Sequence, residues 1–287
     1  MSLDALQLGL LLLTGLGAGA LGALVGIGGG VIVVPVLVLG FGTDVQVAVA
    51  ASLVAVIATS SAAGSVYARQ GIVNMRLAMT LEVATTAGAL AGGITAALVP
   101  QMALLLVFSV FLVITALLLF LGTPQGERRP PGEGEETTGY EAHGRLAGAF
   151  QSPRTGELVE YRARRLPLGL AVSFVAGNVS GLLGVGGGFI KVPAMRAGMR
   201  VPMRVAAATS NFMIGVTAAA SLVIYIQQGF LYPLLAAPIA VGVTAGALAG
   251  TRASSLVSGR TLARLLAVLL LVLAVQIGLK AAGVSLG

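Results

Sequence analysis

Eight long apolar runs divide the sequence and limit the folds open to the chain. They cover residues 3–25, 45–67, 76–99, 101–121, 166–184, 203–226, 231–252 and 261–282. Most approach the ~20 residues that an α-helix needs to cross a hydrocarbon core of ~30 Å. Only 9% of the 287 residues are charged, whereas a water-soluble domain has about 25%. We therefore expect an all-α polytopic membrane protein.

Two shorter apolar pieces, 31–41 and 189–199, interrupt this pattern. Each directly follows a glycine cluster, at 26–30 and at 184–188. A helix of about eleven residues is only ~16 Å long at 1.5 Å per residue. Neither piece can span a bilayer alone, so we expect each to be a re-entrant or broken helix.

An internal repeat relates the two halves of the chain at a constant offset of 158 residues. Gly26–Pro35 aligns with Gly184–Pro193, which share the pattern Gly-x-Gly-Gly-Gly followed by a proline five residues later. About 29 of the 74 pairs between 19–92 and 177–250 are identical. The sequence thus predicts two membrane repeats, 1–121 and 166–287, each with about four long helices and one short helix.

The segment between the repeats, 122–165, is strongly charged. It contains seven of the ten acidic residues and seven of the seventeen basic ones. Pro130-Pro131-Gly132 and the following glutamates and glycines are typical of a linker. A turn sequence separates two partly apolar pieces within 145–162, which predicts a small β-hairpin.

The distribution of lysine and arginine predicts opposite orientations for the two halves. Basic loops lie at 69–76 in the first half and at 196–204 and 252–264 in the second. The equivalent loops of the other half contain no lysine or arginine. Because cytoplasmic loops are enriched in these residues, we expect inverted repeats in the cell membrane, with a cytoplasmic central loop and both termini outside. Such inversion recurs in secondary transporters.

The two glycine breaks are candidates for an anion site. Glycine-rich backbone can expose N–H groups, and the following helix adds its positive N-terminal end. Val31 and Phe189 replace the third glycine of a dinucleotide fingerprint. Alternatively, the glycines only allow helices to cross closely. The candidate ligands are Gly28, Gly29, Gly30, Gly186, Gly187 and Gly188.

Lys191 and Glu82 are the ionisable residues placed at membrane depth. A lysine there costs roughly 2.5–3.5 kcal/mol on insertion scales, so a bound anion or Glu82 should compensate Lys191. The lysine could instead extend to the interface. Glu82 is a candidate for proton coupling, or it could pair with Arg76 or Arg69 near its helix end.

Small polar residues supply further candidates for hydrogen bonds to a ligand: Ser52, Asn178, Thr209, Ser210 and Asn211. The alternative is that they form hydrogen bonds between helices. The pairs Gly88/Gly92 and Gly246/Gly250 favour close helix packing instead.

Nothing in the sequence indicates a cofactor or a metal site. The chain has no cysteine, and its one histidine, His143, lies in the polar loop. A nucleophile–base pair or paired carboxylates at depth are also missing, which argues against an enzyme. The expected partners are a small anion and the lipid bilayer, without nucleic acid, and a homodimer remains open.

The paired glycine motifs, in the context of two repeats, resemble the sulfite exporter TauE/SafE family. The resemblance covers both membrane halves and leaves out the 122–165 loop. It implies a secondary transporter that moves small sulfur-containing anions, such as sulfite or organosulfonates. An anion channel and a receptor without transport are the alternatives that the sequence leaves open.

Overall fold

The computed structural model describes residues 4–25, 28–121, 146–151, 158–253 and 259–283. Eight of its helices are long and apolar enough to cross a membrane. The eight are α1 (Ala5–Val25), α3 (Val45–Arg69), α4 (Met75–Leu98), α5 (Gln101–Leu121), α6 (Leu166–Leu183), α8 (Met203–Gln227), α9 (Pro233–Ala253) and α10 (Gly259–Ala281). The prediction of an all-α polytopic membrane protein is confirmed.

The two short helices also lie where the sequence placed them. Helix α2 covers Gly30–Gly40, and helix α7 covers Gly188–Pro193. A π-helical turn, Ala194–Gly198, continues α7. With that turn, the second short segment occupies the positions equivalent to α2.

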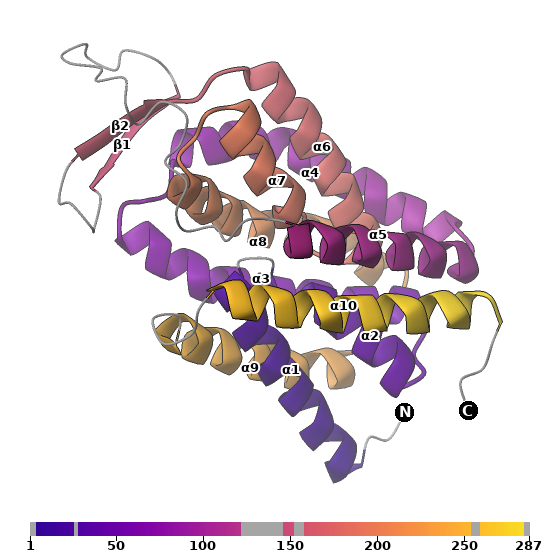
Figure 1. Cartoon of the computed structure of the whole chain (residues 1–287). Coiled ribbons are helices and arrows are strands. Elements are labelled where there is room, and N and C mark those ends of the chain that lie inside the picture. Colours follow the sequence, from indigo (N-terminus) through magenta and orange to yellow (C-terminus); the bar gives the residue numbers. More distant parts are fainter. Residues whose placement is uncertain (1–3, 26–27, 122–145, 152–157, 254–258, 284–287) are drawn as a thin grey trace.

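Helices from one half pack most closely against helices from the other. Helix α1 lies along α9, and α6 lies along α4 (Figure 1). Glycines permit this approach: a Cβ at Gly88 would strike the Phe174 carbonyl, and one at Gly246 would strike the Leu16 carbonyl. Each residue of the first contact lies 158 positions from its counterpart in the second. The predicted packing role of these glycines is confirmed.

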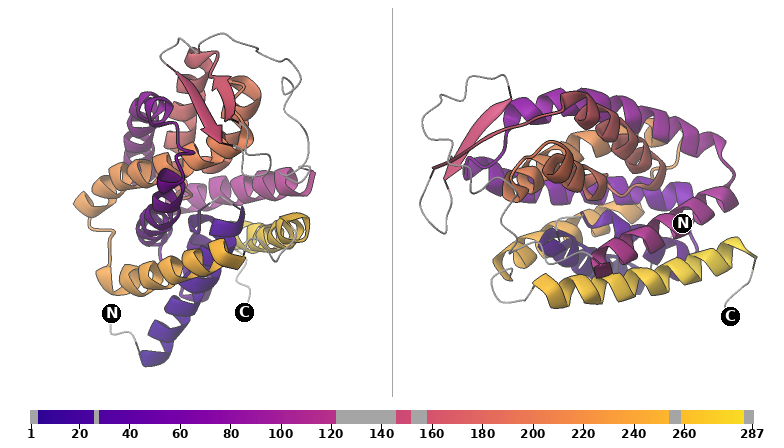
Figure 2. Two further views of the ribbon diagram at one scale, coloured as in Figure 1. Left: turned by 90° about the vertical axis from the view of Figure 1, so that its left-hand side faces the viewer. Right: turned by 45° about the horizontal axis from the view of Figure 1, so that its top comes forward.

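The next two largest contacts join equivalent helices. Helix α3 packs on α8 at the centre, and α5 lies beside α10 at one side of the bundle (Figures 1 and 2). Each short helix packs on the long helix that follows it, α2 on α3 and α7 on α8. The same set of contacts is therefore made twice.

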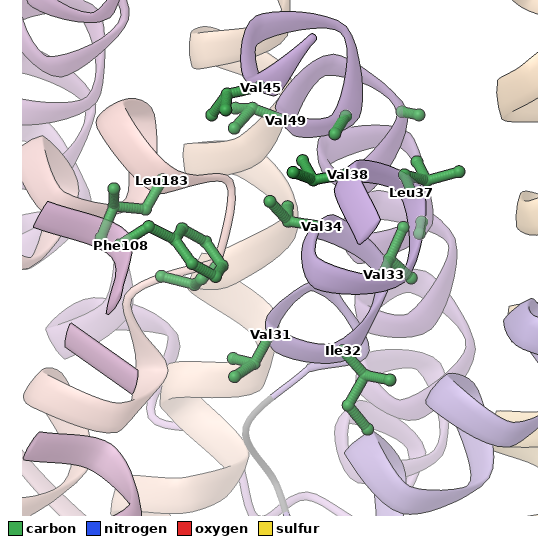
Figure 3. Close-up of a cluster of buried hydrophobic side chains, with 14 of the residues drawn as sticks. Val31, Ile32, Val33, Val34, Leu37, Val38, Val45, Val49, Phe108 and Leu183 are labelled. Carbon is green, nitrogen blue, oxygen red and sulfur yellow. The ribbon is translucent and has the colours of Figure 1, made fainter. Parts of the chain in front are cut away.

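The core surrounds α2, which is apolar on all sides. Its side chains from Val31 to Val34 are almost fully buried, and they meet residues of both halves, including Phe108 and Leu183 (Figure 3). A helix that is hydrophobic all round is typical of a buried position. This environment explains how an eleven-residue helix can be stable.

The predicted hairpin of the central segment is confirmed. Strands β1 (Ala147–Gln151) and β2 (Leu158–Arg162) pair antiparallel, with Ala147 opposite Arg162. The hairpin projects from one end of the helix bundle (Figures 1 and 2). There the Arg164 amide donates to the Met199 carbonyl at 3.0 Å.

Loops group at the two ends of α3 in the pattern of their charges. Asn74, in the basic loop 69–76 that follows α3, contacts Thr209 and the hairpin. At the start of α3, Asp44 shares a pocket with Tyr232. The 25 residues of α3 separate these groups by roughly 37 Å. The sides of the membrane and the boundaries 1–121, 122–165 and 166–287 stay predictions.

Candidate functional site

The two glycine breaks begin alike but differ at the next residue, because Gly29 has a φ of −67° and Gly187 has a φ of 67°. Gly28 and Gly186 adopt positive φ angles of 82° and 80°, a region that glycine enters without steric cost. The Gly29 carbonyl then accepts bonds from the amides three and four residues later, and the Gly187 carbonyl does the same. Each break therefore turns directly into the first turn of a short helix, whose leading N–H groups have no partner within the helix.

The breaks meet at the centre of the molecule. The Ser52 hydroxyl lies 2.7 Å from the Gly184 carbonyl oxygen and 3.3 Å from that of Gly30. Ser52 is fully buried. A Cβ at Gly30 would strike the Gly184 carbonyl, so the two backbones are in direct contact. Ser52 thus joins the two breaks. This contact agrees with the alternative in which Ser52 forms hydrogen bonds between helices.

Ser210, which is equivalent to Ser52, has a different environment. It lies beside Gly188, as Ser52 lies beside Gly30. Its hydroxyl is buried, yet no hydrogen-bond partner for it occurs among the described residues. A buried hydroxyl without a partner is costly. Ser210 is therefore free to bind a ligand that enters the second break.

Lys191 lies one turn beyond the second break and is only 1% exposed. Its ammonium group donates to the Thr217 hydroxyl of α8 at 3.3 Å. The Thr217 hydroxyl in turn lies 2.8 Å from Glu82 Oε1 of α4. Lys191 does not extend to the interface, so that alternative is wrong. Glu82 compensates it through a threonine.

Glu82 is also buried, at 8% exposure. Besides Thr217, its Oε1 receives a long bond of 3.4 Å from Thr86. Its second oxygen, Oε2, is buried and has no partner among the described residues. The carboxylate is thus only half satisfied. It faces Lys191 and Thr217, in contrast to the alternative in which it pairs with Arg76 or Arg69.

Three other candidate ligands make contacts away from the glycine breaks, two of them through backbone atoms. The Thr209 hydroxyl accepts the Asn74 amide at 3.1 Å near the hairpin. The backbone carbonyl of Asn211 accepts the Ser60 hydroxyl where α3 crosses α8. The backbone of Asn178 packs against Gly88 and Gly92 of α4. These contacts fit the alternative of hydrogen bonds and packing between helices.

The sequence analysis missed Thr217, which links the two buried charges. Thr217 repeats Thr59 at the offset of 158, and that repetition could have drawn attention to it. Tyr225 repeats Tyr67 in the same way, and its phenol donates to the Gly181 carbonyl at 2.9 Å. Tyr225 is 2% exposed, so it belongs to the core.

No group of three or more metal-ligating side chains occurs among the described residues, which do not include His143. The buried charged cluster consists of one ammonium and one carboxylate. Its chemistry suits the binding of an anion or a proton.

The two ends of α3 differ in how open they are. A pocket of about 450 Å³ lies at the end with Asp44 and Tyr232. At the equivalent place in the second half, Tyr161 of the hairpin packs against a buried cluster that includes Val201 and Val205. The Asn74 amide donates to the Tyr161 phenol there, at 3.0 Å. Partial burial raises the pKa of Tyr161 above its ordinary value, so the phenol stays neutral.

Comparison with known proteins agrees with this arrangement. The family described as "Sulfite exporter TauE/SafE" matches residues 11–277, nearly the whole chain. The chain belongs to this family. It is also 28% identical, over 239 residues, to a "Probable membrane transporter protein YunE" of Bacillus subtilis. That match covers 80% of this chain and 83% of the relative. No solved structure matches.

Members of the TauE/SafE family are membrane transporters, and this chain has the eight apolar helices that such a role requires. The family match includes both glycine breaks, both short helices and the Lys191–Thr217–Glu82 cluster. The buried charges therefore lie within the region that matches the family.

Proposed function

We propose that this chain exports a small oxyanion, sulfite or an organosulfonate, through a site where the two glycine breaks meet. The observation that carries the proposal is Lys191, a fully buried cation one turn beyond a break. A lysine at this depth is a functional-site candidate because its burial is costly. The family name supports the sulfur-containing substrate.

The second break offers three kinds of donor to such an anion. The first N–H groups of α7 follow Gly187, the Ser210 hydroxyl has no partner among the described residues, and Lys191 adds a positive charge. The first break, from Gly28 to Gly30, would add backbone N–H groups. Oxyanions accept several hydrogen bonds at once, so this donor set matches their chemistry.

The grouping of loops at the two ends of α3 supports the orientation inferred from charge. In this proposal the hairpin end faces the cytoplasm, and the Asp44 pocket faces outward. The donor set holds no nucleophile–base pair, which supports transport in place of catalysis. A monovalent anion that leaves a negative-inside cell unaccompanied gains ~2.3 kcal/mol per 100 mV, so export needs no coupling ion on energetic grounds.

The proposal is tested by flux from liposomes that contain the purified protein. The probes are methanesulfonate, sulfite and sulfate. We expect release of methanesulfonate and sulfite, and loss of at least ~90% of it in Lys191→Met, because the neutral side chain keeps the volume without the charge. Val33→Ala, at the equivalent position of α2, is the matched control and should retain flux. Equal flux in Lys191→Met and wild type would contradict the role of the charge.

Orientation is measured separately, because the chain has no native cysteine. Single cysteines replace Ser2 and Tyr140, both outside the described residues. A membrane-impermeant thiol reagent applied to cells should label the first and spare the second. Labelling of both from one side would contradict the proposed orientation.

A further inference from the structure

The buried cluster contains one cation and one anion, and this balance has a consequence for transport. Lys191 donates to Thr217, and Thr217 lies within hydrogen-bond distance of Glu82. The ammonium and the carboxylate therefore act on each other through one hydroxyl, in a place that water reaches poorly. In the empty protein their charges cancel.

Few other charges act on this cluster. Helices α6 and α8 pack against α4. Helix α6 contains no ionisable side chain, and α8 contributes Arg204 near its start and Tyr225 near its end. On α4 itself, Arg76 is exposed in the first turn. Lys191 is the charged group whose electrostatic field acts on Glu82.

An anion that binds Lys191 would add a second negative charge beside the same ammonium. With Glu82 ionised, the cluster would then carry a net negative charge in a medium of low dielectric constant, which is strongly unfavourable. The carboxylate has an oxygen, Oε2, that is buried and unpartnered in the part of the chain that the structure describes. Protonation of Glu82 restores neutrality, and it removes the cost of that unsatisfied charged oxygen.

We propose that each monovalent anion is transported together with one proton carried by Glu82. The inference rests on the proposed function. On the loading side, the anion binds the Lys191 ammonium while a proton from water binds the Glu82 carboxylate. On the release side, both leave to water, and the carboxylate again compensates Lys191 through Thr217. The proton is taken up and released without any other bond being made or broken.

This exchange makes transport electroneutral. The empty cluster holds Lys191 and Glu82 as a compensated pair, and the loaded cluster holds the anion, the ammonium and a neutral carboxylic acid. Neither form moves net charge through the membrane, so export by the wild-type protein follows the gradients of the anion and the proton in place of the membrane potential. Replacing Glu82 with glutamine would leave a positive empty form, so a negative-inside potential would then drive anion export.

The test uses methanesulfonate, because this strong-acid anion carries no proton of its own near neutral pH. Liposomes with wild-type protein are loaded with it, and an internal pH dye reports proton movement during efflux. We expect one proton to leave with each anion, and the final anion gradient to be independent of a clamped membrane potential. In Glu82→Gln, we expect no proton movement and a gradient that shifts up to ~50-fold per 100 mV.

Two outcomes separate this inference from the proposed function. Wild-type efflux without internal alkalinisation, with a gradient that follows the potential, would overturn proton coupling and leave the transporter assignment intact. Absence of wild-type methanesulfonate flux would contradict the proposed function itself, and the inference would fall with it. The wild-type stoichiometry decides the matter even if Glu82→Gln folds poorly. Thr95→Val, on the same helix but bonded to the Ala91 carbonyl, is the control that should keep coupling.

Discussion

The short helices α2 and α7 occupy equivalent positions but present different side chains. Val33 of α2 is buried among aliphatic residues, whereas Lys191 of α7 reaches Thr217. Thr59, the counterpart of Thr217, bonds to the Ala55 carbonyl of its own helix at 2.7 Å and to no other helix among the described residues. Ala240 stands where the first half has Glu82. Both halves thus keep the threonine, but Glu82 of the first half and Lys191 of the second meet at only one of the two equivalent sites, the site around Thr217.

The ends of the molecule differ in a similar way. At one end the hairpin packs on a buried cluster that includes Val201 and Val205, and at the other end the equivalent residues line an open pocket with Tyr232. Shared sequence therefore explains the scaffold, because both halves must satisfy the same packing. The departures from the repeat indicate where the two copies have separate roles.

The largest effect should come from placing a charge at Val33, the uncharged counterpart of Lys191. Val33→Lys would bury an ammonium without a compensating carboxylate, and we expect a loss of about 3 kcal/mol or more in the free energy of unfolding. Adding Ala240→Glu should recover part of it, since the Lys191 arrangement would then be reproduced around Thr59. Thermal unfolding in detergent measures both variants. If Val33→Lys alone were as stable as wild type, the sites around Thr59 and Thr217 would not differ as described.

The second-largest effect should come from a difference in how tightly the two glycine breaks are packed. A Cβ at Gly30 would lie 2.7 Å from the Ser52 hydroxyl and would also strike the Gly184 carbonyl. At Gly188 the nearest atoms belong to the Ile214 side chain, which can move. We expect Gly30→Ala to cost up to about 3 kcal/mol and Gly188→Ala closer to 1 kcal/mol.

Gly40→Ala is the control for this pair, because nothing lies within 4 Å of its Cβ position. It should leave the unfolding temperature unchanged. Equal losses for Gly30→Ala and Gly188→Ala would show that the breaks are packed alike.

The smallest effect is expected for Ser52 and Ser210, which occupy equivalent positions in the two halves. Ser52→Ala would leave the buried Gly184 carbonyl without its donor, which costs about 1–3 kcal/mol. Ser210→Ala removes a hydroxyl that bonds to no described residue, so its stability should change by less than about 0.5 kcal/mol. Its methanesulfonate flux should nevertheless fall if the hydroxyl binds the anion. The reverse ranking of stabilities would contradict this assignment.

Much of the fold could be predicted from the sequence, because the sequence features that indicate it are local or occur in both halves. Apolar runs located the eight long helices, and the offset of 158 located α2 and α7 after their breaks. The turn in the central segment predicted the hairpin. The loops 69–76 and 196–204, both basic, lie near the hairpin, whereas the inverted orientation and the sides of the membrane stay predictions.

The candidate site was harder to predict, because side-chain direction depends on helix rotation. Ser210 and Thr209 are neighbours in sequence, yet one lies beside Gly188 and the other contacts Asn74. A step of one residue turns a helix by about 100°, which apolar periodicity cannot resolve in a chain this hydrophobic. The link through Thr217 required the packing of α4, α7 and α8 together.

The central claim is that the charged site, around Thr217, binds the anion at Lys191. Unfolding temperature measured against methanesulfonate concentration tests it directly, since a ligand that binds the folded state stabilises it by about 2.7 kcal/mol at 100 times its dissociation constant. We predict a rising unfolding temperature in wild type and in the Val33→Ala control, and none in Lys191→Met. The same rise in Lys191→Met would contradict the account.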